Sequence, residues 1–180
     1  MKKSCFYEYF LFFLFYSFVG GLYEVLLGIF IFHIGFVNRG FLFGPYCPVY
    51  GFGALLLLFT LERFKPKSTH ILDVCISTLF LFLGVILITT TVELITSYLM
   101  EFMIGEWLWD YHNYPFNFEG RIALSPSIRF GIGGTIILYI HPILVKTIRK
   151  IKEEYIKGIF YILLALFIID CVSHVFIVIA

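Results

Sequence analysis

A group of polar and charged side chains lies within or beside strongly apolar runs, where such groups usually serve an ion path, a ligand or a structural pair. We predict that these side chains bind a ligand: Glu24, Asn38, Arg39, Cys47, Tyr50, Glu93, Ser97, Glu101, Asp110, Tyr111, Asn117 and Arg121. Glu24 and Glu93 would hold or protonate the ligand, and Arg39 and Arg121 would anchor its anionic part. The alternative is that these four residues form two internal Glu–Arg pairs that hold the helical hairpins together.

Two expected helix starts, at Pro48 and Pro126, strengthen the prediction of an anion-binding site. A helix N-terminus carries a partial positive charge and free N–H groups, so it attracts phosphate or carboxylate groups. Together with Arg39 and Arg121, the two helix starts would form a cradle for such a group. The alternative interpretation is that both prolines simply open ordinary turns.

Other chemistries find less support in the sequence. Cys47 and Ser97 are candidate nucleophiles with His112 or Glu93 as a base, but no G-x-S-x-G signature accompanies them. The cysteines form no C-x-x-C pair and the histidines no H-x-x-x-H pair, so we expect no metal and no cofactor. A P-loop motif is missing, and the net charge of +1 argues against a nucleic-acid partner.

The composition indicates an integral membrane protein. Hydrophobic residues make up 61% of the 180 residues and charged residues only 14%, whereas a soluble domain has about 25% charged residues. The apolar periodic runs predict an all-α fold, a polytopic membrane helix bundle in a single domain over residues 1–180 with about five transmembrane helices. We expect helices over residues 6–34, 48–61, 71–103, 126–145 and 158–180.

The stretch from Phe36 to Gly53 is the part of the chain around which the helices are organised. It holds an Arg, two Pro and four Gly between two apolar runs, so it cannot be a regular helix throughout. The following helix, residues 48–61, would be roughly 21 Å long, which is shorter than the bilayer core of about 30 Å. We therefore predict that part of this stretch is re-entrant and completes the crossing, which requires that it is buried in protein or lines a wet cavity.

The distribution of basic residues predicts the orientation. Lysine and arginine concentrate at the N-terminus, after the second helix and between residues 146 and 157, and cytoplasmic loops carry such an excess. We expect a cytoplasmic N-terminus and an extracytoplasmic C-terminus in the cell membrane. The polar groups above would then converge on one outward-facing pocket, beside a loop in which Trp107 and Trp109 would lie at the membrane interface.

Four segments in the same order resemble the signature of a known bacterial family. They are residues 38–53 (NRGFLFGPYCPVYGFG), 93–101 (ELITSYLME), 109–111 (WDY) and 116–122 (FNFEGRI). The chain is similar on these segments to the family named type IV ABC-transporter membrane proteins, a permease-like family. Leu108 and His112 depart from the family's usual Arg-Trp-Trp-Asp-Tyr-Ser pattern.

The resemblance implies a permease-like inner-membrane protein in the lipid bilayer, with a separate cytoplasmic ATPase and assembly into a homo-oligomer as partners. The pocket would take an anionic or amphipathic ligand. The alternative is a membrane enzyme or binding protein that acts on lipid or cell-wall precursors at the outer leaflet. A third class is a purely structural membrane partner.

Overall fold

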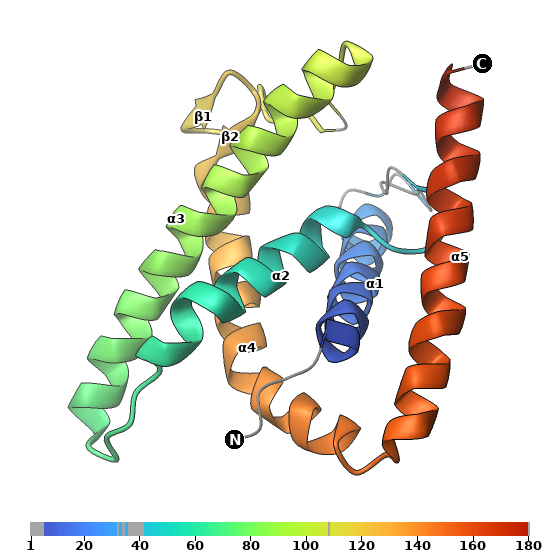
Figure 1. The fold of residues 1–180 in the computed structure, drawn as a ribbon. Helices are drawn as coiled ribbons and strands as arrows, with labels where there is room; N and C mark the ends of the chain where they lie inside the picture. Colours follow the sequence, from blue (N-terminus) through green and yellow to red (C-terminus); the bar gives the residue numbers. More distant parts are fainter. Residues whose placement is uncertain (1–5, 32, 34, 36–41, 108, 180) are drawn as a thin grey trace. The chain divides into compact units, whose positions relative to one another are not determined.

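The computed structural model describes residues 6–31, 33, 35, 42–107 and 109–179, and this part is mainly helical (Figure 1). The helices are α1 (Phe6–Phe30), α2 (Pro48–Leu61), α3 (Ile71–Ile104), α4 (Leu124–Ile148) and α5 (Glu153–Ile179). A short 3-10 helix η1 (Glu62–Phe64) follows α2, and strands β1 (Asn117–Phe118) and β2 (Ile122–Ala123) precede α4. The predicted all-α membrane helix bundle is confirmed.

Four of these helices are long and apolar enough to cross a membrane: α1, α3, α4 and α5. The fifth, α2, has 14 residues with the predicted bounds, because Pro48 opens it and the polar residues from Glu62 onward follow its last apolar residue. At about 1.5 Å per residue it is too short to span a bilayer core alone.

The ends of three helices differ from the predicted bounds. α1 ends at Phe30 instead of residue 34, because His33 and Gly35 have positive φ angles of 53° and 78°, which a right-handed helix does not allow. α4 begins at Leu124, so Ser125 is not its N-cap; the chain passes from strand β2 directly into the helix. α5 begins at Glu153, five residues before the predicted start, because acidic residues in the first turn are favoured by the helix dipole.

The chain forms two compact units, and each is described here by itself. Unit 1 comprises the described residues up to Leu55 and from Ile143 onward, and unit 2 comprises residues 56–142. In unit 1, the first part of α1 contacts α5 in the same order along both helices, since Phe6 contacts Phe160 (ring centroids 6.1 Å apart) and Phe13 contacts Phe167 (5.7 Å). An ion pair joins the same ends of this helix pair.

That ion pair lies between Arg149 and Glu8, at 3.5 Å. The two residues stand close to the N-terminal ends of α5 and α1, respectively. Aromatic contacts therefore join the N-terminal part of α1 to the first half of α5, and opposite charges join the two helices near their N-terminal ends.

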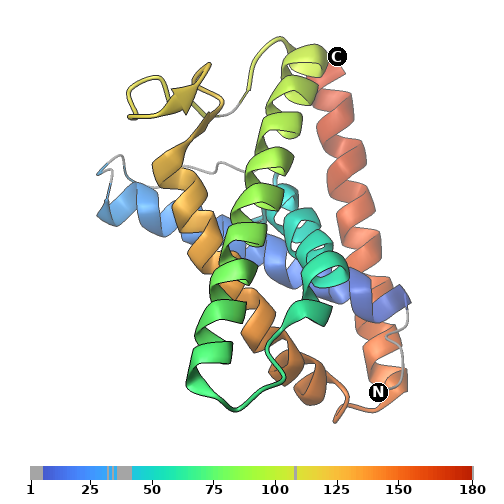
Figure 2. The same ribbon diagram turned by 90° about the vertical axis from the view of Figure 1, so that its left-hand side faces the viewer.

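In unit 2, the long helix α3 packs against α4 at small residues. A Cβ atom at Gly134 would come within 2.8 Å of Val85 and Leu57, so this glycine permits close approach. Thr90 donates a hydrogen bond to Ser127 at 2.8 Å. The hairpin of β1 and β2 lies near the C-terminal end of α3, as both views show (Figure 2); its register pairs residue 117 with 123 and 118 with 122.

Candidate functional site

The polar residues of unit 2 gather where the β1–β2 hairpin meets α3. Between the strands, Glu119 and Gly120 have positive φ angles of 51° and 66°, and the Arg121 N–H donates to the Phe118 carbonyl at 2.9 Å. Two consecutive residues with positive φ are typical of tight hairpin turns. The turn leaves the Arg121 side chain almost fully buried, with 6% exposed.

Arg121 is the centre of a group that we call the Arg121 cluster: Tyr98, Glu101, Trp107, Glu119 and Arg121. Its guanidinium carbon lies 4.0 Å from the ring centroid of Tyr98 and 4.0 Å from that of Trp107. Its nitrogens pair with Glu101 and, at 3.4 Å, with Glu119. Cation–π attraction and two carboxylates thus compensate the buried charge.

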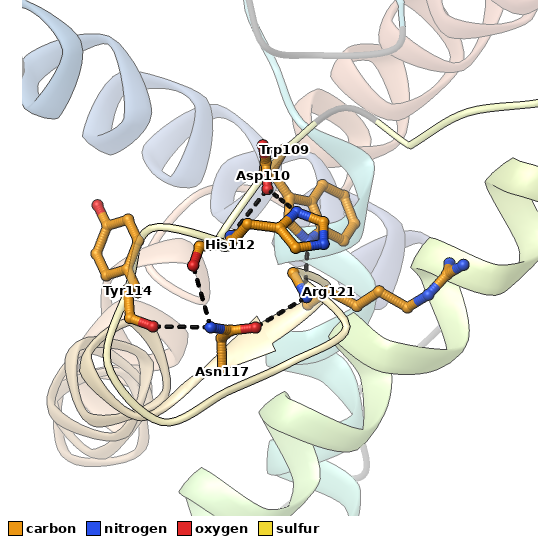
Figure 3. Close-up of polar contacts among 7 residues, drawn as sticks. Trp109, Asp110, His112, Tyr114, Asn117 and Arg121 are labelled. Carbon is orange, nitrogen blue, oxygen red and sulfur yellow. Dashed lines mark hydrogen bonds and ion pairs between the residues drawn. The ribbon is translucent and has the colours of Figure 1, made fainter.

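The hairpin loop is stabilised by its own side chains (Figure 3). The Asn117 amide donates to the carbonyls of His112 (3.2 Å) and Tyr114 (2.9 Å) and accepts from the Gly120 N–H at 3.1 Å. Trp109 Nε1 donates to the Arg121 carbonyl at 2.7 Å, which joins the start of the loop to its end. The Asn117 side chain therefore forms its hydrogen bonds within the loop.

Asp110 accepts the backbone N–H of His112 at 2.9 Å and also contacts the His112 ring (Figure 3). The backbone hydrogen bond, followed by the bond to the imidazole ring, lowers the pKa of Asp110 below its usual value. Both side chains are exposed, so this contact shapes the loop surface.

Glu93 lies on α3 and is buried, with 7% exposed. The Tyr111 hydroxyl donates to Glu93 Oε1 at 2.9 Å, and this bond connects the C-terminal half of the helix to the loop. Ser97 is fully buried, but its hydroxyl donates to the Leu94 carbonyl at 2.7 Å within the same helix. Among the described residues, Glu93 therefore has a hydrogen bond to the loop, whereas the Ser97 hydroxyl bonds within its own helix.

In unit 1, a second group surrounds the irregular segment that precedes α2. We call it the Asp170 cluster: Phe43, Gly44, Tyr46 and Asp170. The Asp170 carboxylate accepts the N–H of Phe43 at 3.0 Å, the N–H of Gly44 at 2.9 Å and the hydroxyl of Tyr46. The carboxylate on α5 thereby binds consecutive backbone donors of a segment more than 120 residues away in sequence.

The segment also contacts α1. The Cys47 N–H donates to the Ser17 carbonyl at 2.9 Å, and the Tyr50 hydroxyl bonds Glu24. A Cβ at Gly20 would come within 2.2 Å of the Tyr50 ring, and one at Gly51 within 2.2 Å of Ser17 Oγ. Only glycine allows α1 and the start of α2 to approach this closely.

The structure brings several predicted residues together, but in pairs. Glu24 meets Tyr50 in unit 1, while Glu93 meets Tyr111 and Glu101 meets Arg121 in unit 2. Asn38 and Arg39 lie outside the described residues. A single pocket that joins residues of both units stays a prediction, as do the Glu24–Arg39 pair and the anion cradle.

The predicted set omitted Tyr46, Tyr98, Trp107, Glu119 and Asp170. Asp170 carried a signal, since a carboxylate within an apolar helix is expensive and usually has a specific partner. Tyr98 lies three residues before Glu101 on α3 and therefore on the same helical face. No sequence pattern indicates that Arg121 lies between two aromatic rings.

A family of known proteins matches nearly the whole chain. The family is described as "Putative ABC-transporter type IV", and the match covers residues 11–175. No protein with a curated description and no solved structure matches the chain. The matched range includes the Arg121 cluster and the Asp170 cluster.

Proposed function

Since the chain belongs to the ABC-transporter type IV family, we propose that it is the membrane-spanning, permease-like component of such a transporter. The observation that carries the proposal is the family match over residues 11–175, together with four long apolar helices within that range or overlapping it. The chain is a multi-pass membrane protein. Its sequence has no P-loop, so a separate cytoplasmic ATPase would supply the energy.

The proposed orientation places the N-terminus in the cytoplasm and the C-terminus outside. The matching order of the α1–α5 contacts supports it, because two spanning helices that point in the same direction require an odd number of crossings between them. α3 and α4 supply two, so α2 would supply the third. The basic residues before α5, among them Arg149 beside Glu8, would then lie in the cytoplasm, as the positive-inside rule favours.

The re-entrant segment is part of the same proposal. Cys47 bonds Ser17, which lies 11 residues after Phe6, or about 17 Å along α1. Pro48 therefore starts α2 close to the middle of α1, whose 25 residues extend over about 37 Å. The irregular residues before Pro48 would complete the crossing from the outer side.

The contacts of Arg121 support an amphipathic ligand as part of the proposal. Two carboxylates already balance the charge of Arg121, which disfavours a free anion as its partner. Arg121 Nη1 is buried and has no hydrogen-bond acceptor within the described part of the chain. The N–H groups of Nη1 would thus donate to the polar group of an amphipathic ligand, and the apolar helices would contact its hydrophobic part.

The test is to purify the tagged chain from membranes and identify what accompanies it. We expect an ATPase that co-purifies in a fixed ratio, a chain stoichiometry that reveals a homo-oligomer, and ATP hydrolysis in lipid vesicles that an amphipathic substrate stimulates. A chain that is isolated without an ATPase and turns over lipid or cell-wall precursors would contradict the proposal and favour a membrane enzyme.

A further inference from the structure

Asp170 presents an ionisable group in the apolar helix α5, and both of its oxygens are engaged. Oδ1 accepts the Phe43 N–H at 3.0 Å, and Oδ2 accepts the Gly44 N–H at 2.9 Å and the Tyr46 hydroxyl. No ion pair with Asp170 occurs among the described residues. Neutral donors from one short segment therefore solvate this carboxylate.

The opposite side of the segment contacts α1. The Cys47 N–H bonds the Ser17 carbonyl at 2.9 Å. The Pro45 carbonyl lies 3.3 Å from the position of a Cβ at Gly21, so backbone meets backbone there. Within unit 1, residues 43–47 are thus bonded to α5 on one side and to α1 on the other.

The segment has few bonding partners of its own. Among its described residues, Tyr46 N–H bonds the Gly44 carbonyl at 2.8 Å, whereas the Phe43 and Gly44 N–H groups bond Asp170. An unsatisfied backbone N–H is strongly disfavoured in the hydrocarbon region of a bilayer. Without the carboxylate, these two donors would have to reach water.

We propose that Asp170 is a positioning residue, a latch that keeps residues 43–47 seated against α1 and within the membrane. The inference rests on the re-entrant segment proposed above. If the hydrogen bonds to Asp170 broke, residues 43–47 would move toward the outer surface. This movement would expose the region next to Tyr50 and Glu24. The donors on the segment are uncharged, so the strength of the latch depends on the acceptor oxygens of Asp170 and on the Tyr46 hydroxyl.

Cys47 is a built-in reporter for this movement. The other cysteines, Cys5, Cys75 and Cys171, are replaced by Ser, and right-side-out vesicles are treated with a membrane-impermeant maleimide. We expect slow labelling of Cys47 in this background and labelling about tenfold or more faster in Asp170→Asn, because an amide provides one acceptor in place of two. Asp170→Glu, which keeps the carboxylate, should label at a rate closer to the parent.

Matched variants keep the test decisive. Asp73→Asn removes an exposed carboxylate of α3 that accepts a hydrogen bond from Ser68, and it should leave the Cys47 rate unchanged. If Asp170→Asn does not fold, Tyr46→Phe removes one donor only and should raise the rate by a smaller factor. An unchanged Cys47 rate in folded Asp170→Asn or in Tyr46→Phe would overturn the latch.

The re-entrant segment itself is tested separately in the same vesicles. Glu106→Cys, at an exposed position, provides the labelling rate of a residue in water. If Cys47 of the parent reacts as fast as this control, the segment is not within the membrane, and the proposed crossing fails before the latch is considered. A slow parent rate with no effect of Asp170→Asn would instead retain the crossing and reject only the latch.

Discussion

The Asp170 cluster and the Arg121 cluster stabilise a charged side chain in opposite ways. Asp170 is a single carboxylate that accepts neutral donors, two backbone N–H groups and one tyrosine hydroxyl. Arg121 is a single cation that meets two carboxylates and the faces of two aromatic rings. The first cluster therefore depends on backbone position, and the second depends on opposite charge and ring geometry.

The difference indicates which kind of substitution each unit tolerates. Backbone donors act only when the segment is placed correctly, and in unit 1 this placement requires close contact at glycines. In unit 2 the loop is already held by Asn117 and by Trp109, so the side chains of the cluster have more freedom. We expect steric changes to damage unit 1 most and charge changes to damage unit 2 most.

The largest expected effect is steric and lies in unit 1. In Gly51→Ala the new Cβ would lie 2.2 Å from Ser17 Oγ and 2.5 Å from the Phe13 carbonyl, so we expect a loss of about 3 kcal/mol of unfolding free energy, as overpacking produces. Reversible unfolding in detergent micelles measures it. Gly53→Ala is the control, because no atom lies within 4 Å of its Cβ position; equal losses in both variants would contradict the close-packing argument.

The next effect concerns the geometry of the cation in unit 2. Arg121→Lys keeps the charge but removes the planar group that stacks between Tyr98 and Trp107, and we expect a loss of about 2 kcal/mol. The matched control is Arg63→Lys, an exposed arginine over the Phe64 ring at 4.9 Å, which should change stability by less than about 0.5 kcal/mol. If Arg121→Lys were as stable as the wild type, the charge at this position alone would account for its contribution to stability.

A smaller effect compares the same chemistry in both units. Tyr111→Phe removes the hydroxyl that donates to Glu93, and Tyr50→Phe removes the hydroxyl that bonds Glu24. We expect a loss of about 1–2 kcal/mol for the first and less for the second, because Glu93 is buried while Glu24 is only half-buried. The double variant Tyr111→Phe with Glu93→Gln measures the coupling energy between the two side chains. A coupling energy of zero would show that this hydrogen bond does not contribute to the stability of unit 2.

The smallest effect is a pH dependence of the loop. Because its bonds to His112 lower the pKa of Asp110, the stabilisation is complete above the usual carboxyl pKa and is lost as the pH falls through the lowered pKa of the folded loop. Hydrogen exchange over residues 109–123, corrected for intrinsic rates, should show faster opening in that acidic range. Asp110→Asn should lack this change, and an identical acid response in the variant would assign it to another group.

The helices were predictable because each depends on residues close together in sequence. Long apolar runs predicted α1, α3, α4 and α5, and Pro48 with the charged turn after Leu61 predicted both ends of α2. The left-handed Gly105 that ends α3 is a typical helix terminator, so this end was predicted to within one residue. The pairing of Glu93 with Tyr111 was not predicted, although both residues were.

What the sequence by itself determined is the class of the protein, its apolar helices and its family, since length, hydropathy and short motifs are properties of contiguous residues. Only the tertiary structure decided the partners of the charged groups. Asp170 meets Gly44, and Arg121 lies between Tyr98 and Trp107. The physical reason is that helical spacing specifies neighbours within an element, whereas contacts between elements depend on how the helices pack and where the chain turns back.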